Sequence, residues 1–314
     1  MMKIYKTFDG LLRTLDVPEK DCWISLVKPT PEEQQSISER YNIDSADLSA
    51  ALDDDERSRI AIEDGYTLIL VDVPTVEERS GKDWYVTLPL AIILLPDAVI
   101  TVCLEDTPIL SFFDNRRIRS FHTYMKTRFV LQILYRNATL FLQYLRAIHK
   151  KSEQLEQKLQ ASTQNRELLE LLELEKSLLY FTTSLKGNDA VLDKLLKSNS
   201  IPKYPEDTDL LEDVIVENRQ AMEMAGIYSG ILRGMADAFA SIISNNLNIV
   251  MKVLAIVTIV LSIPTMIFSA YGMNVSMGSM PFAGHPFAFP IILGISMVLA
   301  GVVALCFVKL RTFR

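Results

Sequence analysis

The sequence predicts a membrane protein of mixed α+β and all-α character. It consists of an N-terminal α/β domain, a long helical stalk and two C-terminal transmembrane helices. Three observations predict this class. No Lys, Arg, Asp or Glu occurs in the 56 residues from 253 to 308. Before about residue 120, short β-branched apolar runs alternate with helix-start signals. From residue 122 onward, helix-breaking residues are sparse within long amphipathic patterns.

The distribution of charge excludes several classes of protein. All 39 acidic residues and 29 of the 32 Lys and Arg residues lie in residues 1–252, whose formal charge is 29 − 39 = −10. A nucleic-acid-binding protein would need a basic surface instead. The three cysteines, Cys22, Cys103 and Cys306, lie far apart, which argues against a disulfide framework. Three histidines and scattered serines form no catalytic constellation, so we expect no enzyme and no cofactor.

Residues 1–120 are predicted to form a cytosolic α/β domain. Thr30-Pro31-Glu32-Glu33 combines an N-cap residue, a proline at the first helical position and acids in the first turn, so it predicts a helix start. Apolar, β-branched runs predict strands near Lys3–Phe8, Cys22–Val27, Thr67–Val73, Trp84–Leu95 and Ala98–Leu104.

Residues 121–206 are predicted to form a cytosolic helical hairpin region. Its helices are expected at His122–Gln160 and Arg166–Lys186, with loops around Gly187–Asp189 and Ser198–Pro205. A stalk helix is then predicted over residues 207–270. At 1.5 Å per residue it would be roughly 95 Å long, so it would run from the cytoplasm into the membrane.

Two stretches are apolar enough to cross a hydrocarbon core, which takes about 20 residues. They are Val253–Ala270 and Ile291–Val308, each extended by its neighbours. We expect the first transmembrane helix at about 250–270 and the second at 289–309. The alternative is a buried helical hairpin in a soluble core.

Basic residues predict the orientation of these spans. Lys252 precedes the first span, and Lys309, Arg311 and Arg314 follow the second, whereas the loop at 271–288 has no Lys or Arg. By the positive-inside rule, both termini are cytoplasmic, including a basic cytosolic tail at 310–314, and the loop is extracellular. We expect a multi-pass protein of the plasma or inner membrane. Because two helices cannot enclose a pore, transport would require a ring of several chains.

A polar series with gaps of alternately four and three residues follows the stalk into the first span. Its members are Asp237, Ser241, Ser244, Asn248, Met251, Ala255, Thr258, Ser262, Thr265 and Ser269. This period of 3.5 residues places one small, mostly hydroxyl or amide face on an otherwise aliphatic helix. One interpretation is a pore lining. The other is that these hydroxyls bond to their own backbone and the small residues pack helices closely.

The first span ends in Tyr271-Gly272-Met273-Asn274. This Gly-Met-Asn sequence, with the α/β domain, the long helices, the short loop and the brief basic tail, resembles the CorA family of divalent-cation channels over the whole chain. The resemblance implies a homopentameric funnel in the lipid bilayer that carries Mg²⁺, often also Co²⁺ or Ni²⁺, down the electrochemical gradient. It also implies that Gly272, Met273 and Asn274 form an outer selectivity ring, where Gly272 would allow a close or strained turn.

The family's pore-lining positions map onto Asp237, Asn248, Met251, Leu254 and Thr265, and all but Leu254 belong to the polar series. We therefore expect the lining to comprise Asp237, Asn248, Met251, Leu254, Thr258, Ser262, Thr265 and Ser269. The family also senses cytosolic Mg²⁺ through acids, one of which maps onto Asp213. Its partner aligns near Ala50, which cannot bind a metal, but Asp53, Asp54 and Asp55 lie close by and would replace it.

The outer loop departs from the family pattern. Many members have Met-Pro-Glu-Leu there, whereas this chain has Met280-Pro281-Phe282 and no acid between Asn274 and the second span. The related zinc-transporting ZntB branch typically has Ile at the position of Met273. The intact Gly-Met-Asn of this chain thus favours Mg²⁺ over Zn²⁺. Because the outer loop departs from the family pattern, zinc or other transition-metal transport remains the nearer alternative. A membrane-anchored coiled-coil signalling or scaffold protein is the distant one.

Overall fold

The computed structural model describes residues 1–79, 81–114, 121–161, 165–197, 201, 204–274, 278, 280–282 and 285–309. The chain divides into two compact units, Met1–Ala236 and Asp237–Arg314. The boundary falls inside one 67-residue helix, α6 (Pro205–Tyr271). The predicted basic tail at 310–314 lies outside the described residues.

The first unit is built on a seven-stranded sheet in the order β2-β1-β3-β7-β6-β5-β4. Its strands are β1 (Met2–Phe8), β2 (Leu11–Leu15), β3 (Cys22–Val27), β4 (Arg59–Glu63), β5 (Tyr66–Arg79), β6 (Lys82–Leu94) and β7 (Ala98–Cys103). Only the β3–β7 pair is parallel among the strands described; the other neighbours are antiparallel. The five predicted strands are present, and β2 and β4 are additional.

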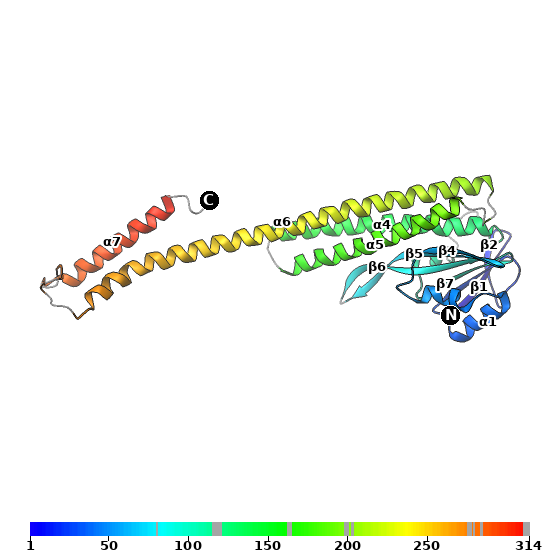
Figure 1. Ribbon diagram of the computed structural model, residues 1–314, viewed down its shortest axis with the longest axis horizontal. Coiled ribbons are helices and arrows are strands. Elements are labelled where there is room, and N and C mark those ends of the chain that lie inside the picture. The colour runs from blue at the N-terminus through cyan, green and yellow to red at the C-terminus, as the bar shows by residue number, and fades with distance from the viewer. Residues whose placement is uncertain are drawn as a thin grey trace. The chain divides into compact units, whose positions relative to one another are not determined.

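Both faces of the sheet are buried, because alternate residues of a strand point to opposite sides. On one face Trp23 lies in a core shared with helices α3 (Pro108–Asp114) and α4 (Lys126–Ala161). On the other face Ile24 lies in a core shared with α1 (Pro31–Tyr41), α2 (Ser45–Ser49) and η1 (Ala50–Leu52). Figure 1 shows α1 on one side of the sheet and α4 and α5 (Asn165–Lys197) on the other.

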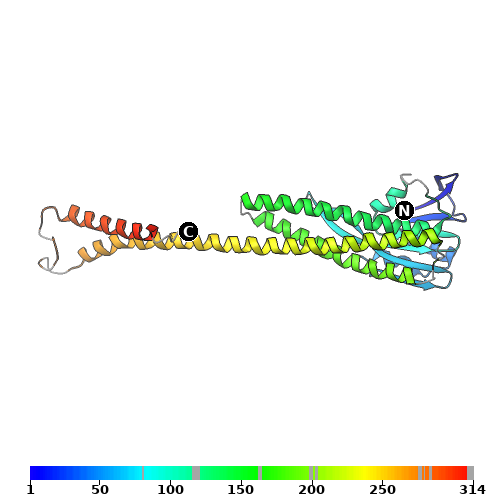
Figure 2. The same cartoon turned by 90° about the horizontal axis from the view of Figure 1, so that it is seen from above.

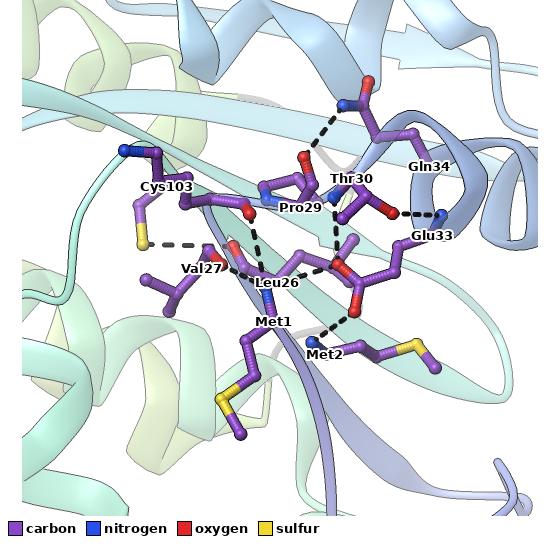
Figure 3. Close-up of polar contacts among 10 residues, drawn as sticks. Met1, Met2, Leu26, Val27, Pro29, Thr30, Glu33, Gln34 and Cys103 are labelled. Atoms are coloured by element: carbon purple, nitrogen blue, oxygen red, sulfur yellow. Dashed lines mark hydrogen bonds and ion pairs between the residues drawn. The ribbon is translucent and has the colours of Figure 1, made fainter.

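The start of α1 follows the predicted capping chemistry. The Thr30 hydroxyl accepts a hydrogen bond from the Glu33 backbone N–H at 3.3 Å, and the Glu33 carboxylate accepts one from the Thr30 N–H at 3.0 Å. The same carboxylate also accepts from the Met2 N–H at 2.9 Å, so it joins the helix start to β1 (Figure 3). Local sequence thus determines where α1 begins. The contact with β1 is long-range, because Met2 and Glu33 lie 31 residues apart.

Within the first unit, the N-terminal part of α6 packs on both α4 and α5, and the two views agree on this arrangement (Figures 1 and 2). Arg128 of α4 pairs with Glu206 and Asp207 at 2.6 and 3.1 Å, and Arg219 of α6 pairs with Asp189 of α5 at 3.2 Å. These ion pairs and the buried residues beneath them hold α6 against the helical layer.

The loop predicted at Gly187–Asp189 is wrong, because α5 continues through these residues to Lys197. A glycine costs a helix about 1 kcal/mol relative to alanine, which is why it suggested a break. Here the glycine has a packing role instead: a Cβ at Gly187 would lie 3.0 Å from the Ser58 Oγ. The missing side chain lets α5 approach the chain just before β4.

In the second unit, α6 continues from Asp237 and is followed by α7 (Ala288–Lys309). Each of these helices contains an apolar stretch long enough to cross a membrane, and none of that stretch in α6 is buried. A helical hairpin in a soluble core would be buried, so this exposure favours membrane spans. The predicted transmembrane stretches at about 250–270 and 289–309 lie within α6 and α7.

Candidate functional site

The polar series forms one continuous exposed face of α6. All ten of its members, Asp237, Ser241, Ser244, Asn248, Met251, Ala255, Thr258, Ser262, Thr265 and Ser269, are exposed in the single chain. Leu254 flanks this face and is also exposed. The described part of the chain therefore leaves the whole series free for contact with an ion, lipid or another copy.

Three hydroxyl groups on this face donate to the helix backbone. Thr258 Oγ1 donates to the Leu254 carbonyl at 2.8 Å, Ser262 Oγ to the Ile259 carbonyl at 2.8 Å and Thr265 Oγ1 to the Leu261 carbonyl at 3.0 Å. A hydroxyl group has one proton to donate and two lone pairs that accept. With the proton committed to the helix, these oxygens present only acceptors outward. The two interpretations of the series are therefore compatible.

The other face of α6 packs against α7. Ile256, Val260 and Ile267 are half-buried on α6, and Ile292, Ser296 and Ala300 are buried on α7. Among the described residues of this unit, α6 and α7 are the two long helices, so each is buried mainly by the other. Positions 256 and 267 each lie two residues from positions 258 and 265 of the series, which is about 200° around a helix. Consequently α7 covers the side of α6 away from the polar face.

The Gly-Met-Asn residues follow the last turn of α6. The Gly272 N–H donates to the carbonyls of Phe268 and Ser269 at 3.0 and 3.1 Å, and the Met273 N–H donates to the Ala270 carbonyl at 3.4 Å. Met273 is 60% exposed, and Asn274 is exposed as well. The Asn274 amide thus stands at the same end of α6 as Ser269, the last member of the polar series.

Gly272 does not need its conformational freedom within the single chain. Its φ lies outside the left-handed region, and an added Cβ would make only ordinary contacts, at 3.5 Å, with the carbonyl oxygens of Phe268 and Ser269. The expected strained turn is therefore absent from this chain.

The loop after Asn274 is described only at residues 278, 280–282 and 285–287. The Tyr271 hydroxyl donates to the Pro281 carbonyl at 2.8 Å, which joins the end of α6 to the loop. His285 Nδ1 accepts a hydrogen bond from the Phe287 N–H at 3.2 Å, just before α7 begins. This ring nitrogen therefore already has a hydrogen-bond donor in the turn that precedes α7.

The predicted regulatory acids are exposed but are not brought together. Asp213 lies on α6, and Asp53, Asp54 and Asp55 follow η1. No hydrogen bond or ion pair in the described part of the chain joins Asp213 to the other three, and the described residues contain no group of three potential metal ligands. Ala50 is 5% exposed in the core beside α1, so this position faces away from any surface site.

The packing face of α7 was missed in the sequence. Ser296 and Ala300 are four residues apart, so they share one side of the helix and let α6 come close. That spacing was a usable signal, but it is weak within a helix that is apolar all round.

Comparisons with known proteins show which family has this sequence and fold. A family model described as CorA-like Mg²⁺ transporter protein matches residues 19–309. The cobalt/magnesium transport protein CorA of Methanocaldococcus jannaschii is 28% identical over 287 residues, which cover 88% of this chain and 86% of that protein.

Two solved structures have a similar fold. The complete CorA magnesium transporter of Methanocaldococcus jannaschii matches with a TM-score of 0.83 at 24% identity, covering 99% of this chain and 98% of that one. The ZntB cytoplasmic domain of Vibrio parahaemolyticus matches with a TM-score of 0.59 at 11% identity, covering 78% and 97%. At these identities both likenesses concern the fold alone. The family model, in contrast, spans most of the chain and both apolar helices, so the chain belongs to the CorA family of divalent-cation transporters, which are membrane proteins.

Proposed function

We propose that this chain assembles as a homopentamer that conducts Mg²⁺, and also Co²⁺ and Ni²⁺, into the cytoplasm. The observation that carries the proposal is the acceptor face of α6, which carries no charge from Ser241 to Ser269 and lies on the side of the helix away from α7. Asn274 follows the same end of α6 as Ser269. Identical chains joined head to tail can form a closed ring around a central axis. In the proposed ring, α6 would be the inner helix of each chain, and its polar face would point toward that axis. Five copies are what the family resemblance implies.

The chemistry of the face suits a hydrated divalent cation. Mg²⁺ dehydrates reluctantly and keeps several waters, whose hydrogens point outward. Amide oxygens of Asn274 and Asn248 and the hydroxyl oxygens of the polar series accept hydrogen bonds from such waters. Carboxylates would hold the ion more tightly and slow its release. Gly272, Met273 and Asn274 would form the outer selectivity ring, and the eight expected lining positions the path below it.

The membrane potential would supply the driving force. Moving one elementary charge across 100 mV is worth about 2.3 kcal/mol, so a divalent ion gains about 4–5 kcal/mol on entry. Lys252 and Lys309 flank the two spans at the ends away from the 271–288 loop. In our proposal these ends and both termini face the cytoplasm of a plasma or inner membrane, and the loop faces outward.

Replacing Asn274 by alanine should reduce Mg²⁺ uptake into liposomes at least about tenfold, because each subunit loses its outer acceptor. Asn246→Ala is the control: Asn246 is likewise an exposed asparagine, but it lies on α6 about 200° around the helix from Asn248 of the polar series. It should transport like the unmodified protein. Uptake of Mg²⁺, Co²⁺ and Zn²⁺ would be compared for all three proteins. Unchanged Mg²⁺ flux in the Asn274 variant would exclude a selectivity ring at this residue. Faster uptake of Zn²⁺ than of Mg²⁺ by the unmodified protein would favour the ZntB-like alternative.

Cysteine labelling tests which face of α6 is accessible to water. In a Cys306→Ser background, Ser262→Cys should react with a membrane-impermeant thiol reagent and lose transport, whereas Ile267→Cys, on the α7 side, should do neither. Burial raises the pKa of Cys22, and that of Cys103 to about 12, so these buried thiols stay unreactive at neutral pH. Equal labelling at both positions would contradict a pore lined by the polar face.

We also propose that Asp213, with Asp53, Asp54 and Asp55, senses cytoplasmic Mg²⁺ and holds the ring closed when the ion is bound. Asp213→Ala should then shift inhibition by internal Mg²⁺ to at least about threefold higher concentration, since a carboxylate ligand is lost. Asp209→Ala, which removes an exposed acid one turn earlier on α6, serves as the control for charge alone. Inhibition of the Asp213 variant at the unmodified concentration would exclude Asp213 as the sensor.

A further inference from the structure

Three exposed phenylalanine side chains lie where α6 connects to α7. Phe282, Phe287 and Phe289 are 52%, 64% and 70% exposed in the single chain. The first two belong to the connection between the helices, and Phe289 is in the first turn of α7. Contact with water is unfavourable for apolar rings of this size, so three of them exposed within residues 282–289 indicate a surface that binds something apolar.

The connection is held against the end of α6. Tyr271 is the last residue of α6, and its hydroxyl group donates to the Pro281 carbonyl at 2.8 Å. Phe282 follows Pro281 directly, so its ring lies close to the level at which the apolar stretch of α6 ends. Figure 1 shows the end of α6 and the start of α7 at the same end of this helix pair.

The length of α7 places the other two rings at the same level. Its 22 residues, at a rise of 1.5 Å each, are about 33 Å long, and the hydrocarbon core of a bilayer is about 30 Å thick. Lys309 ends the helix on one side of that core. Phe289 is the second residue of α7 and Phe287 immediately precedes the helix, so both stand at the opposite boundary of the hydrocarbon.

The backbone here leaves few groups that need water. Three residues of the segment are prolines, which have no backbone N–H: Pro281, Pro286 and Pro290. The His285 N–H donates to the Phe282 carbonyl at 3.0 Å, and the Ala288 N–H donates to the His285 carbonyl at 3.0 Å. The Phe287 N–H donates to His285 Nδ1 at 3.2 Å. Because unpaired backbone groups are costly close to hydrocarbon, these internal bonds suit a segment that lies on lipid.

The surface is continuous with the membrane spans. No Lys, Arg, Asp or Glu occurs from residue 253 to residue 308, so no charged side chain separates the three rings from the apolar stretches of α6 and α7. A charge within the connection would favour contact with water instead. Lipid that surrounds the spans therefore extends to these rings, which identifies the occupant of the surface.

We propose that Phe282, Phe287 and Phe289 anchor the α6–α7 connection in lipid, at the boundary between the headgroups and the acyl chains. Aromatic and aliphatic side chains of interfacial segments insert about 5–10 Å into this region. The lipid contact and the Tyr271–Pro281 hydrogen bond together hold the connection at the end of α6. The anchor goes beyond the proposed function, because it does not depend on which ion the protein carries.

The backbone of Phe282 fits this role. Its φ is +61°, in the left-handed region that bulky residues rarely adopt. Such a conformation persists where other contacts compensate for its cost. Insertion of the exposed Phe282 ring into lipid would provide one such contact, and the hydrogen bonds of the Pro281 and Phe282 carbonyls provide two more.

Fluorescence quenching tests the anchor in the full chain, reconstituted in phosphatidylcholine vesicles. In the Cys306→Ser background, Phe287→Cys labelled with bimane is the reporter, because the aromatic label replaces one ring and leaves the other two. Asp64→Cys, in an exposed turn, is the reference for water, and Val298→Cys, in the middle of α7, is the reference for the acyl chains. The quenchers are iodide on both sides of the membrane and lipids with a nitroxide at a shallow or a deep acyl position.

The reporter should behave as a group at the lipid boundary. Shallow nitroxide lipid should quench it at least about threefold more than it quenches the label at position 64, and more than deep nitroxide lipid does. Iodide should quench it at least about threefold less than the label at position 64. The label at position 298 should instead be quenched best by the deep nitroxide.

Two substitutions should release the reporter into water. Phe282→Ser removes an anchoring ring, and Tyr271→Phe removes the hydroxyl group that holds Pro281. Each should increase iodide quenching of the reporter at least about twofold. Ile62→Ser, at an exposed apolar side chain of β4, and Tyr180→Phe, at an exposed tyrosine of α5, are the matched controls and should leave quenching unchanged. Tyr271→Phe keeps the ring, so it tests the anchor even if Phe282→Ser does not fold.

Three results would overturn the anchor. Iodide quenching of the reporter as strong as at position 64 would place the connection in water. Quenching by neither iodide nor lipid would mean that another copy of the chain covers the rings. Unchanged quenching in both substituted proteins would show that neither the ring nor the hydroxyl group holds the connection. A protein that contacts shallow lipid as expected but carries no Mg²⁺ would support the anchor and refute the proposed function.

Discussion

Hydroxyl groups on α6 donate their protons to the helix's own carbonyls, and this interaction decides what the uncharged face can offer an ion. A helix of Ser and Thr with free protons would present donors as well as acceptors. Thr258, Ser262 and Thr265 present lone pairs alone. That is the complement of a hydrated cation, whose outer surface consists of water hydrogens. In the proposed pore, the absence of charge over residues 253–308 would let the face contact such an ion without trapping it.

The exposure of the polar face of α6 depends on which side of the helix α7 covers. The small residues Ser296 and Ala300 bring α7 onto the far side of α6, so the hairpin covers its aliphatic side and leaves the polar one open. In the first unit, α4 and α5 hold the start of α6 through Arg128, Arg219 and Asn218. Because α6 belongs to both units, these contacts and the polar face are parts of one continuous helix.

Much of this architecture could be predicted from the sequence, because the relevant signals are local. The Thr30 capping chemistry, the five apolar strands and the charge-free helices each depend on neighbouring residues. Strand β4 could not be predicted, since its sequence has no buried apolar run and it forms only by pairing with β5. The helical path through Gly187 depends on Ser58, far away in the sequence. The proposed role of Asn274 is the hardest to derive from one chain, because the proposed ring of amides would require other copies of the chain.

The central claim is that the α6 helices enclose a path along which a divalent cation moves passively. The most direct test is the reversal potential of the current through the unmodified protein in a planar bilayer, with Mg²⁺ gradients as the only variable. Passive conduction predicts a current without nucleotide that reverses at the Mg²⁺ equilibrium potential and follows it as the gradient changes. A current that ignores the Mg²⁺ gradient, or uptake that requires a nucleotide or an opposing proton flux, would contradict this account.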